Sequence, residues 1–169
     1  MKLTSVETYV RKHEIQRRTF TCLSLYCVFL LASCESNKTF FHQYKSVDTS
    51  GWEGDDTLVY HLPPSSKHQV LSAELGVRST DAFRYNTLFV IGTLEKDGHE
   101  ISSDTLFINI YGRDGAPLGK GLLFPTCTQS IPSFEVDSGV EYTYTVRQFM
   151  KAKKLEGVKD VGLKLCIEE

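Results

Sequence analysis

The sequence predicts an all-β protein: a single antiparallel β-sandwich, of jelly-roll or immunoglobulin-like type, after a cleaved lipoprotein signal peptide. Three observations predict this class. From about residue 55, apolar and polar residues alternate with a period of two, as on strands with one buried face. Seven or eight such segments are short and are separated by turns rich in glycine or proline. Residues 1–33 differ in composition from the rest, which is long enough for one hydrophobic core but not for two.

Residues 1–33 show the order of features of a bacterial export signal. Basic residues come first, and an uncharged apolar run follows over 19–31. As a helix this run would span about 20 Å, which is short of the about 30 Å hydrocarbon core of a bilayer. The run therefore predicts the core of a signal peptide. The sequence Leu-Ala-Ser-Cys at 31–34 resembles the bacterial lipobox, in which the cysteine receives a diacylglycerol and becomes the first residue after cleavage.

The chain is therefore predicted to have three parts. Residues 1–33 are the lipoprotein signal peptide, residues 34–54 are the lipidated Cys34 and a tether, and residues 55–169 are the β-sandwich domain. An acylated Cys34 would anchor the domain to a membrane without spanning it. We expect the protein in the cell envelope, at the outer membrane.

The body of the chain alternates in a way that predicts a series of strands. The expected strands are 57–62, 69–78, 86–94, 99–111, 134–136, 140–149 and 157–167. Asp97-Gly98 between two of them is a strong signal for a tight hairpin turn. The segment 147–155 consists of good helix formers and ends before Gly157, so it is the one helix candidate, of a turn or two at most.

Charge and motifs exclude several classes of function. Beyond residue 33 acidic residues outnumber basic ones and no Lys/Arg cluster occurs, which argues against a nucleic-acid partner. The histidines are scattered without metal-ligand spacing, so we predict no metal site. Neither a nucleophile elbow nor a glycine-rich phosphate loop is present. We therefore predict no catalytic residues, no cofactor and no enzyme activity.

Two aromatic residues are candidates for a partner surface. Trp52 is the only tryptophan and lies close to the predicted tether, and Tyr85 precedes a strand. Such side chains can be platforms for a partner or a sugar, but a core anchor is the favoured interpretation for Trp52. Cys127 and Cys166 could pair in an oxidising compartment, although unpaired thiols are favoured because the sequence offers no test of their spacing.

The mature chain resembles the GldH family of gliding-motility lipoproteins from the Bacteroidota. The resemblance is carried by Tyr44-Lys45-Ser46, Gly51-Trp52, 83–89, Asp104-Thr105-Leu106, 114–121, Gln148-Phe149-Met150 and 155–163. These segments cover about residues 34–167, and their order and spacing together are fairly specific. Ala116-Pro117, Phe149 and Lys151 depart from the family pattern.

The resemblance implies a lipid-anchored part in gliding motility, tied in many members to the type IX secretion machinery. It carries no catalytic motif. The leading hypothesis is accordingly a non-catalytic structural or assembly component with envelope protein partners from that motility and secretion machinery. The alternative is a carbohydrate-binding surface lipoprotein, which requires Trp52 or several tyrosines to be exposed on one concave face.

Overall fold

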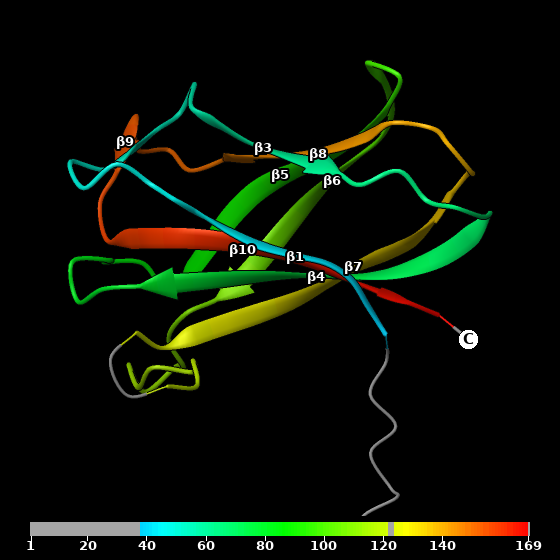
Figure 1. Cartoon of the computed structure of the whole chain (residues 1–169). Coiled ribbons are helices and arrows are strands. Elements are labelled where there is room, and N and C mark those ends of the chain that lie inside the picture. Colours follow the sequence, from blue (N-terminus) through cyan, green and yellow to red (C-terminus); the bar gives the residue numbers. More distant parts are fainter. Residues whose placement is uncertain (1–37, 122–123, 169) are drawn as a thin grey trace, which may run out of the picture. The chain divides into compact units, whose positions relative to one another are not determined.

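The computed structural model describes residues 38–121 and 124–168, which form ten β-strands (Figure 1). In chain order they are β1 (Thr39–Ser46), β2 (Trp52–Glu53), β3 (Thr57–Leu62), β4 (Gln69–Ser79), β5 (Thr87–Lys96), β6 (His99–Asn109), β7 (Thr126–Val136), β8 (Tyr142–Gln148), β9 (Lys154–Leu155) and β10 (Val158–Ile167). This part of the chain forms no helix, and so none that could cross a bilayer. The all-β prediction is confirmed.

Eight of the strands pair into two four-stranded antiparallel sheets. The first sheet has the order β1-β10-β4-β7 and the second has the order β3-β8-β5-β6, while β2 and β9 pair with each other. The pairs are nested along the chain: the first of the eight strands pairs with the last, the second with the seventh, the third with the sixth and the fourth with the fifth. A long hairpin rolled in this way into two layers is a jelly roll, the first of the two predicted sandwich types.

Side chains that alternate along the strands fill the space between the two sheets. The inward residues of the first sheet include Leu71, Ala73, Leu75, Val77, Val161, Leu163 and Leu165, and those of the second include Leu88, Val90, Tyr144 and Val146, all of them buried. One buried hydrogen bond also joins the layers, because the Tyr60 hydroxyl donates to the Val161 carbonyl at 2.8 Å. The period-two pattern thus marked the core correctly.

The predicted hairpin at Asp97-Gly98 connects β5 to β6. Both residues have positive φ, 49° for Asp97 and 77° for Gly98. Two consecutive residues of this kind match the right-handed twist of the flanking strands, which is why the Asp-Gly pair favours a two-residue turn.

The structure has strand in two places where the sequence predicted none. β1 lies within 34–54, the range predicted as a tether, and it pairs with β10 along its whole length. Its polar residues hid the alternation, because β1 is an edge strand whose side chains are mostly half-buried or exposed. β7 begins at Thr126, eight residues before the predicted start at 134, for the same reason.

The helix predicted over 147–155 is wrong. β8 continues to Gln148, and the amide of Phe149 still donates to the carbonyl of Phe89 on β5 at 2.8 Å. Pairing with a neighbouring strand therefore outweighs the helix propensity of these residues. The chain then bends and forms β9 at Lys154–Leu155.

Candidate functional site

Three exposed phenylalanines form a row across the outer face of the second sheet. Phe89 on β5 lies directly opposite Phe107 on β6. On its other side Phe89 faces Phe149, because Val90 pairs with Gln148 and the Phe149 amide bonds to the Phe89 carbonyl. Their exposed fractions are 42% for Phe89, 56% for Phe107 and 56% for Phe149. Cross-strand neighbours of this kind have Cβ atoms about 5 Å apart, so the three side chains make one apolar surface, here named the phenylalanine row.

A buried glutamine shapes the segment that carries Phe149. The Gln148 side-chain Oε1 accepts from the Met150 amide at 2.8 Å, and its Nε2 donates to the Ala152 carbonyl at 3.1 Å. The Met150 sulfur in turn accepts the Phe89 amide at 3.4 Å. The side chain of Gln148 therefore replaces backbone partners where the strand ends and fixes the orientation of Phe149.

The face next to the row is almost uncharged. The outward residues of the next two cross-strand positions are Thr105, Ile91, Arg147 and Thr57, then Ser103, Thr93, Thr145 and Val59. Arg147 is the only charged residue among them. Hydroxyl and apolar side chains on a regular sheet present a surface that another protein can cover without desolvating many charges.

The outer face of the first sheet has an aromatic residue of a different kind. The Tyr44 ring lies over Gly162 of β10 and reaches Gly76 of β4, so a Cβ at Gly162 would meet the ring at 2.5 Å and one at Gly76 would meet the hydroxyl at 2.7 Å. The Arg78 guanidinium lies over the same ring, 4.3 Å from its centroid. Tyr44 is therefore packed from below by a glycine pair and from above by a cation.

Arg78 is held over Tyr44 by a buried carboxylate. Its Nε donates to Asp160 Oδ1 at 2.5 Å, and Asp160 is almost fully buried. This hydrogen bond raises the pKa of Arg78 above its usual value. Tyr44 and 155–163 are among the segments that carry the sequence resemblance, and the structure brings them together as one structural cluster.

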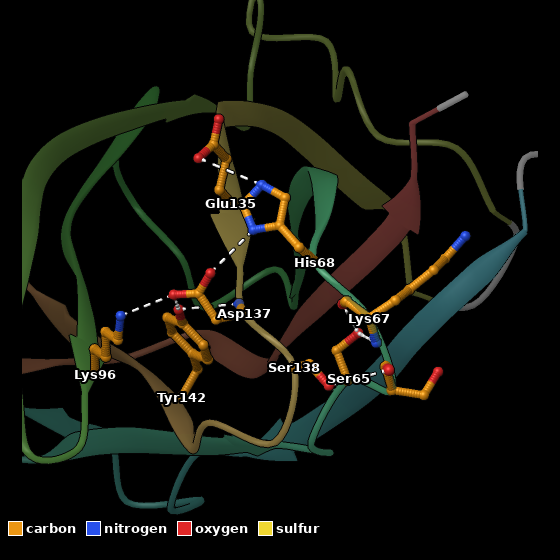
Figure 2. Close-up of polar contacts among 9 residues, drawn as sticks. Ser65, Lys67, His68, Lys96, Glu135, Asp137, Ser138 and Tyr142 are labelled. Atoms are coloured by element: carbon orange, nitrogen blue, oxygen red, sulfur yellow. Dashed lines mark hydrogen bonds and ion pairs between the residues drawn. The ribbon is translucent and has the colours of Figure 1, made fainter.

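Charged side chains converge at the end of the sandwich where β5 and β7 end (Figure 2). Asp137 Oδ2 accepts from Lys96 Nζ at 2.8 Å, and Asp137 Oδ1 lies 3.0 Å from His68 Nδ1. The hydrogen bonds from Lys96 and then His68 hold the pKa of Asp137 at about 2. The cluster is exposed and joins the loop after β7 to the loop before β4. Its charged groups are already partnered with one another.

The two predicted surface residues, Trp52 and Tyr85, differ in their exposure to solvent. Trp52 is only 1% exposed, and its indole N–H donates to the Asp56 carbonyl at 3.0 Å, so it is the core anchor that the sequence favoured. Tyr85 is 43% exposed and packs edge-on against Phe83, with 5.8 Å between ring centroids. Tyr142 and Tyr144 are buried. These residues therefore do not form the concave aromatic face that carbohydrate binding required.

The cysteines and histidines show no site in the described part of the chain. Cys127 and Cys166 are both free, as favoured from the sequence. They pair with Val77 and Ser72, five residues apart on β4, which separates them by about 17 Å and exceeds the reach of a disulfide. Residues 38–121 and 124–168 contain no group of three or more potential metal ligands. Cys34 lies outside the described residues.

The sequence reasoning missed the phenylalanine row. The available signal is the alternation of Phe107 with Leu106 and Ile108, which are buried, and this places Phe107 on the outward side of β6. That Phe89 and Phe149 lie beside it depends on the register of three strands, and register cannot be obtained from the alternation alone.

Comparison with known proteins agrees with the resemblance noted from the motifs. A sequence model of the GldH lipoprotein family matches residues 39–165. The gliding motility lipoprotein GldH of Flavobacterium johnsoniae is 26% identical over 148 residues, which cover 83% of this chain and 92% of that protein. A GldH homolog of Christiangramia forsetii is 24% identical over 152 residues, covering 83% and 91%.

Among solved structures, the match to the Eiger TNF protein of S. frugiperda covers 78% of this chain and 95% of the Eiger chain, at 11% identity. Its TM-score of 0.37 is too low to support any conclusion about this protein. The family match, by contrast, spans β1 to β10 almost completely. The chain belongs to the GldH lipoprotein family.

Proposed function

We propose that this protein is a non-catalytic assembly component of the gliding-motility machinery, held in the outer membrane by a lipid on Cys34. The observation that carries the proposal is the family match over residues 39–165, which follows directly on the lipobox at 31–34. In this proposal residues 1–33 are removed on export, and Cys34 becomes the first residue of the mature protein. Association with type IX secretion belongs to the same proposal and comes from the family resemblance.

The surface features of the domain support an assembly role. The polar groups at Asp137 bind one another and connect two loops, and the Tyr44 cluster is packed into the first sheet. The phenylalanine row, in contrast, is exposed and lies on a rigid sheet. Exposed aromatic side chains on a regular surface are typical of sites where protein partners bind.

Metabolic labelling with radioactive palmitate tests the anchor. The wild-type protein is expected to incorporate label and to fractionate with the outer membrane. Cys34→Ala is expected to lose both properties, with Cys127→Ala as the control that keeps them. Label that persists in Cys34→Ala would refute the lipidation site.

Crosslinking mass spectrometry on the tagged, lipidated protein in its native envelope tests the machinery. Crosslinks to motility or secretion components are expected, together with loss of spreading on agar when the gene is deleted. Crosslinks only to glycan importers, with spreading unchanged by the deletion, would contradict the proposed function.

A further inference from the structure

The edge strand β6 offers a free side for strand pairing. β6 pairs with β5, and no strand of the described residues pairs with its other side. Its register with β5 is regular from Asn109 to Ser102, and it contains no proline. Its first seven residues are all exposed. Such an edge presents a series of unpaired N–H and C=O groups to an incoming strand.

The other edges of the two sheets carry features that hinder pairing. β7 contains Pro132, and its pairing with β4 is interrupted between Leu71 and Ala73. β3 has six residues and is followed by Pro63-Pro64. β1 has an irregular register between Thr39 and Phe41, as the β5–β6 pair has between Leu94 and Glu95, but its regular stretch 41–46 is shorter than 102–109 of β6. Proline, irregular pairing and short length are common ways of protecting an edge, and the stretch 102–109 of β6 has none of them.

On its outer side, the β6 edge continues the phenylalanine row. Phe107 is the end member of the row and belongs to the edge strand itself. A strand added to β6 would place one of its side chains directly beside the exposed Phe107 ring. An apolar side chain at that position would extend the row by one residue.

On its inner side, the edge borders a cleft of about 520 Å³ between β6 and β7. Leu94, Ile131 and Phe134 give it an apolar lining, and Ser102 and Asp104 of β6 contribute to its wall. Asp104 is three residues from Phe107, so the two side chains face opposite sides of the sheet. A residue paired with Asp104 would therefore point into the cleft, while one paired with Phe107 would lie on the row.

The charge of the cleft indicates which side chain would fit. Asp104 and Glu135 line it, and no Lys, Arg or His is among its lining residues. No ion pair in the described part of the chain involves Asp104. Glu135 already lies 3.8 Å from His68. A lysine or arginine would place its apolar stem along Leu94 and Phe134 and its charged head near Asp104.

We propose that β6 binds an extended segment of another envelope protein as an added strand of the second sheet. The segment carries a Lys or Arg that enters the cleft and an apolar residue, an odd number of positions away, that packs on Phe107. The proposal rests on the assembly function above and specifies its docking site and partner chemistry. A second copy of this chain fits poorly, because β6 itself has Glu100 and Asp104 but no Lys or Arg to place in an acidic cleft.

Photo-crosslinking in living cells tests the geometry of binding. Benzoylphenylalanine is placed at position 103, 105 or 107 of the full-length lipidated protein, and the adducts are mapped by mass spectrometry. A strand that pairs with β6 is expected to be captured at positions that shift by two residues with each step, all within one segment that contains a Lys or Arg. Scattered segments, a second copy of this chain, lipid adducts or no adducts would each overturn the proposal.

Matched variants identify the contacts, with the adduct from position 105 as the readout. Phe107→Thr is expected to lower the adduct yield about tenfold, which corresponds to about 1.4 kcal/mol. Phe149→Thr, in the same row but two strands from the edge, should leave it nearly unchanged. Asp104→Asn should also lower the yield, whereas Glu100→Gln, outside the cleft, should not. Equal losses from Phe107→Thr and Phe149→Thr would indicate flat docking on the row and contradict strand addition.

The proposed function and the docking site can fail separately. If deleting the gene leaves spreading intact while the ordered adducts still form, the motility role fails and the edge site stands. If spreading needs the protein but Phe107→Thr and Asp104→Asn spread normally and ordered adducts are missing, the edge site alone fails.

Discussion

The outer faces of the two sheets surround their aromatic residues in opposite ways. On the first sheet, the Tyr44 ring lies on two glycines and beneath Arg78, which Asp160 holds in place. On the second sheet, the row of Phe89, Phe107 and Phe149 lies open to solvent. The first arrangement packs both faces of the ring and stabilises the fold. The second leaves apolar area uncovered.

This difference shows that the role of an aromatic residue on a strand surface depends on the side chains at neighbouring positions. Gly162 and Gly76 have no side chains, and that gap is filled by the ring of a residue on the adjacent strand. Beside the phenylalanine row the neighbouring positions carry ordinary side chains such as Ile91 and Thr105, so nothing folds back over the rings. We therefore assign Tyr44 to stability, and the open row leaves Phe107 available for the proposed strand at the β6 edge.

The largest expected effect is that of Gly162→Ala. The new methyl group would lie 2.5 Å from the Tyr44 ring and force it off the sheet, with loss of its contact with Arg78. We expect the free energy of unfolding to fall by about 3 kcal/mol, as for an overpacked site. Urea unfolding of the purified protein measures this. The same substitution in a Tyr44→Ala background should cost much less. An equal cost would show that the effect of Gly162→Ala does not depend on the Tyr44 ring.

Asp160→Asn is the next largest change. It leaves Arg78 without its buried carboxylate, and because Arg78 is partly exposed we expect a loss of about 2 kcal/mol. Glu53→Gln is a matched control, since Glu53 lies 3.3 Å from Lys154 at the surface and should matter by less than about 0.5 kcal/mol. Similar losses for both variants in thermal unfolding would show that the Arg78 contact is an ordinary surface ion pair.

Phe107→Thr is expected to change the stability of the isolated protein by no more than about 0.5 kcal/mol. The side chain is exposed, and threonine is well suited to a strand surface. Thermal unfolding beside Tyr44→Ala gives the direct contrast between the two faces. A loss for Phe107→Thr as large as that for Tyr44→Ala would mean that the row stabilises the fold.

The smallest expected effect occurs only at acidic pH. It concerns Asp137, which lies on neither of the two outer faces. The pKa of Asp137 is held at about 2, below its ordinary value of 3.8, first by the hydrogen bond from Lys96 and then by that from His68. A lowered carboxyl pKa contributes stability above about pH 4, which is lost as the pH falls toward 2. Melting temperatures between pH 2 and 6 should therefore fall more steeply for the wild type than for Asp137→Asn. Parallel curves would contradict the assigned pKa.

The central strands of the fold could be predicted from the sequence because one face of each is buried. The central strands β4 and β10 differ from their predicted ranges by one residue, and the edge strand β3 agrees with its range. β1 and the start of β7 were missed because burial does not alternate clearly along them. The segment 147–155 was mistaken for a helix because pairing with β5 lies outside local propensity.

The candidate site was less accessible from the sequence. Trp52 gave a correct signal for the core, whereas Tyr85 was singled out although the larger exposed surface lies elsewhere. The phenylalanine row joins residues from β5, β6 and the end of β8, and the cleft beside it joins β6 to β7. Both depend on strand order and register, which the rolled hairpin sets through long-range pairing.

Hydrogen exchange compared between the purified lipidated protein and the same protein in its native envelope tests the account most directly. We expect the amides of residues 102–108 in β6 to exchange more slowly in the envelope, because an added strand would bond those that face the open edge. The amides of β1, at an edge of the first sheet, should exchange equally in both samples. Protection on β1 with none on β6 would contradict the assignment of the second sheet as the binding side.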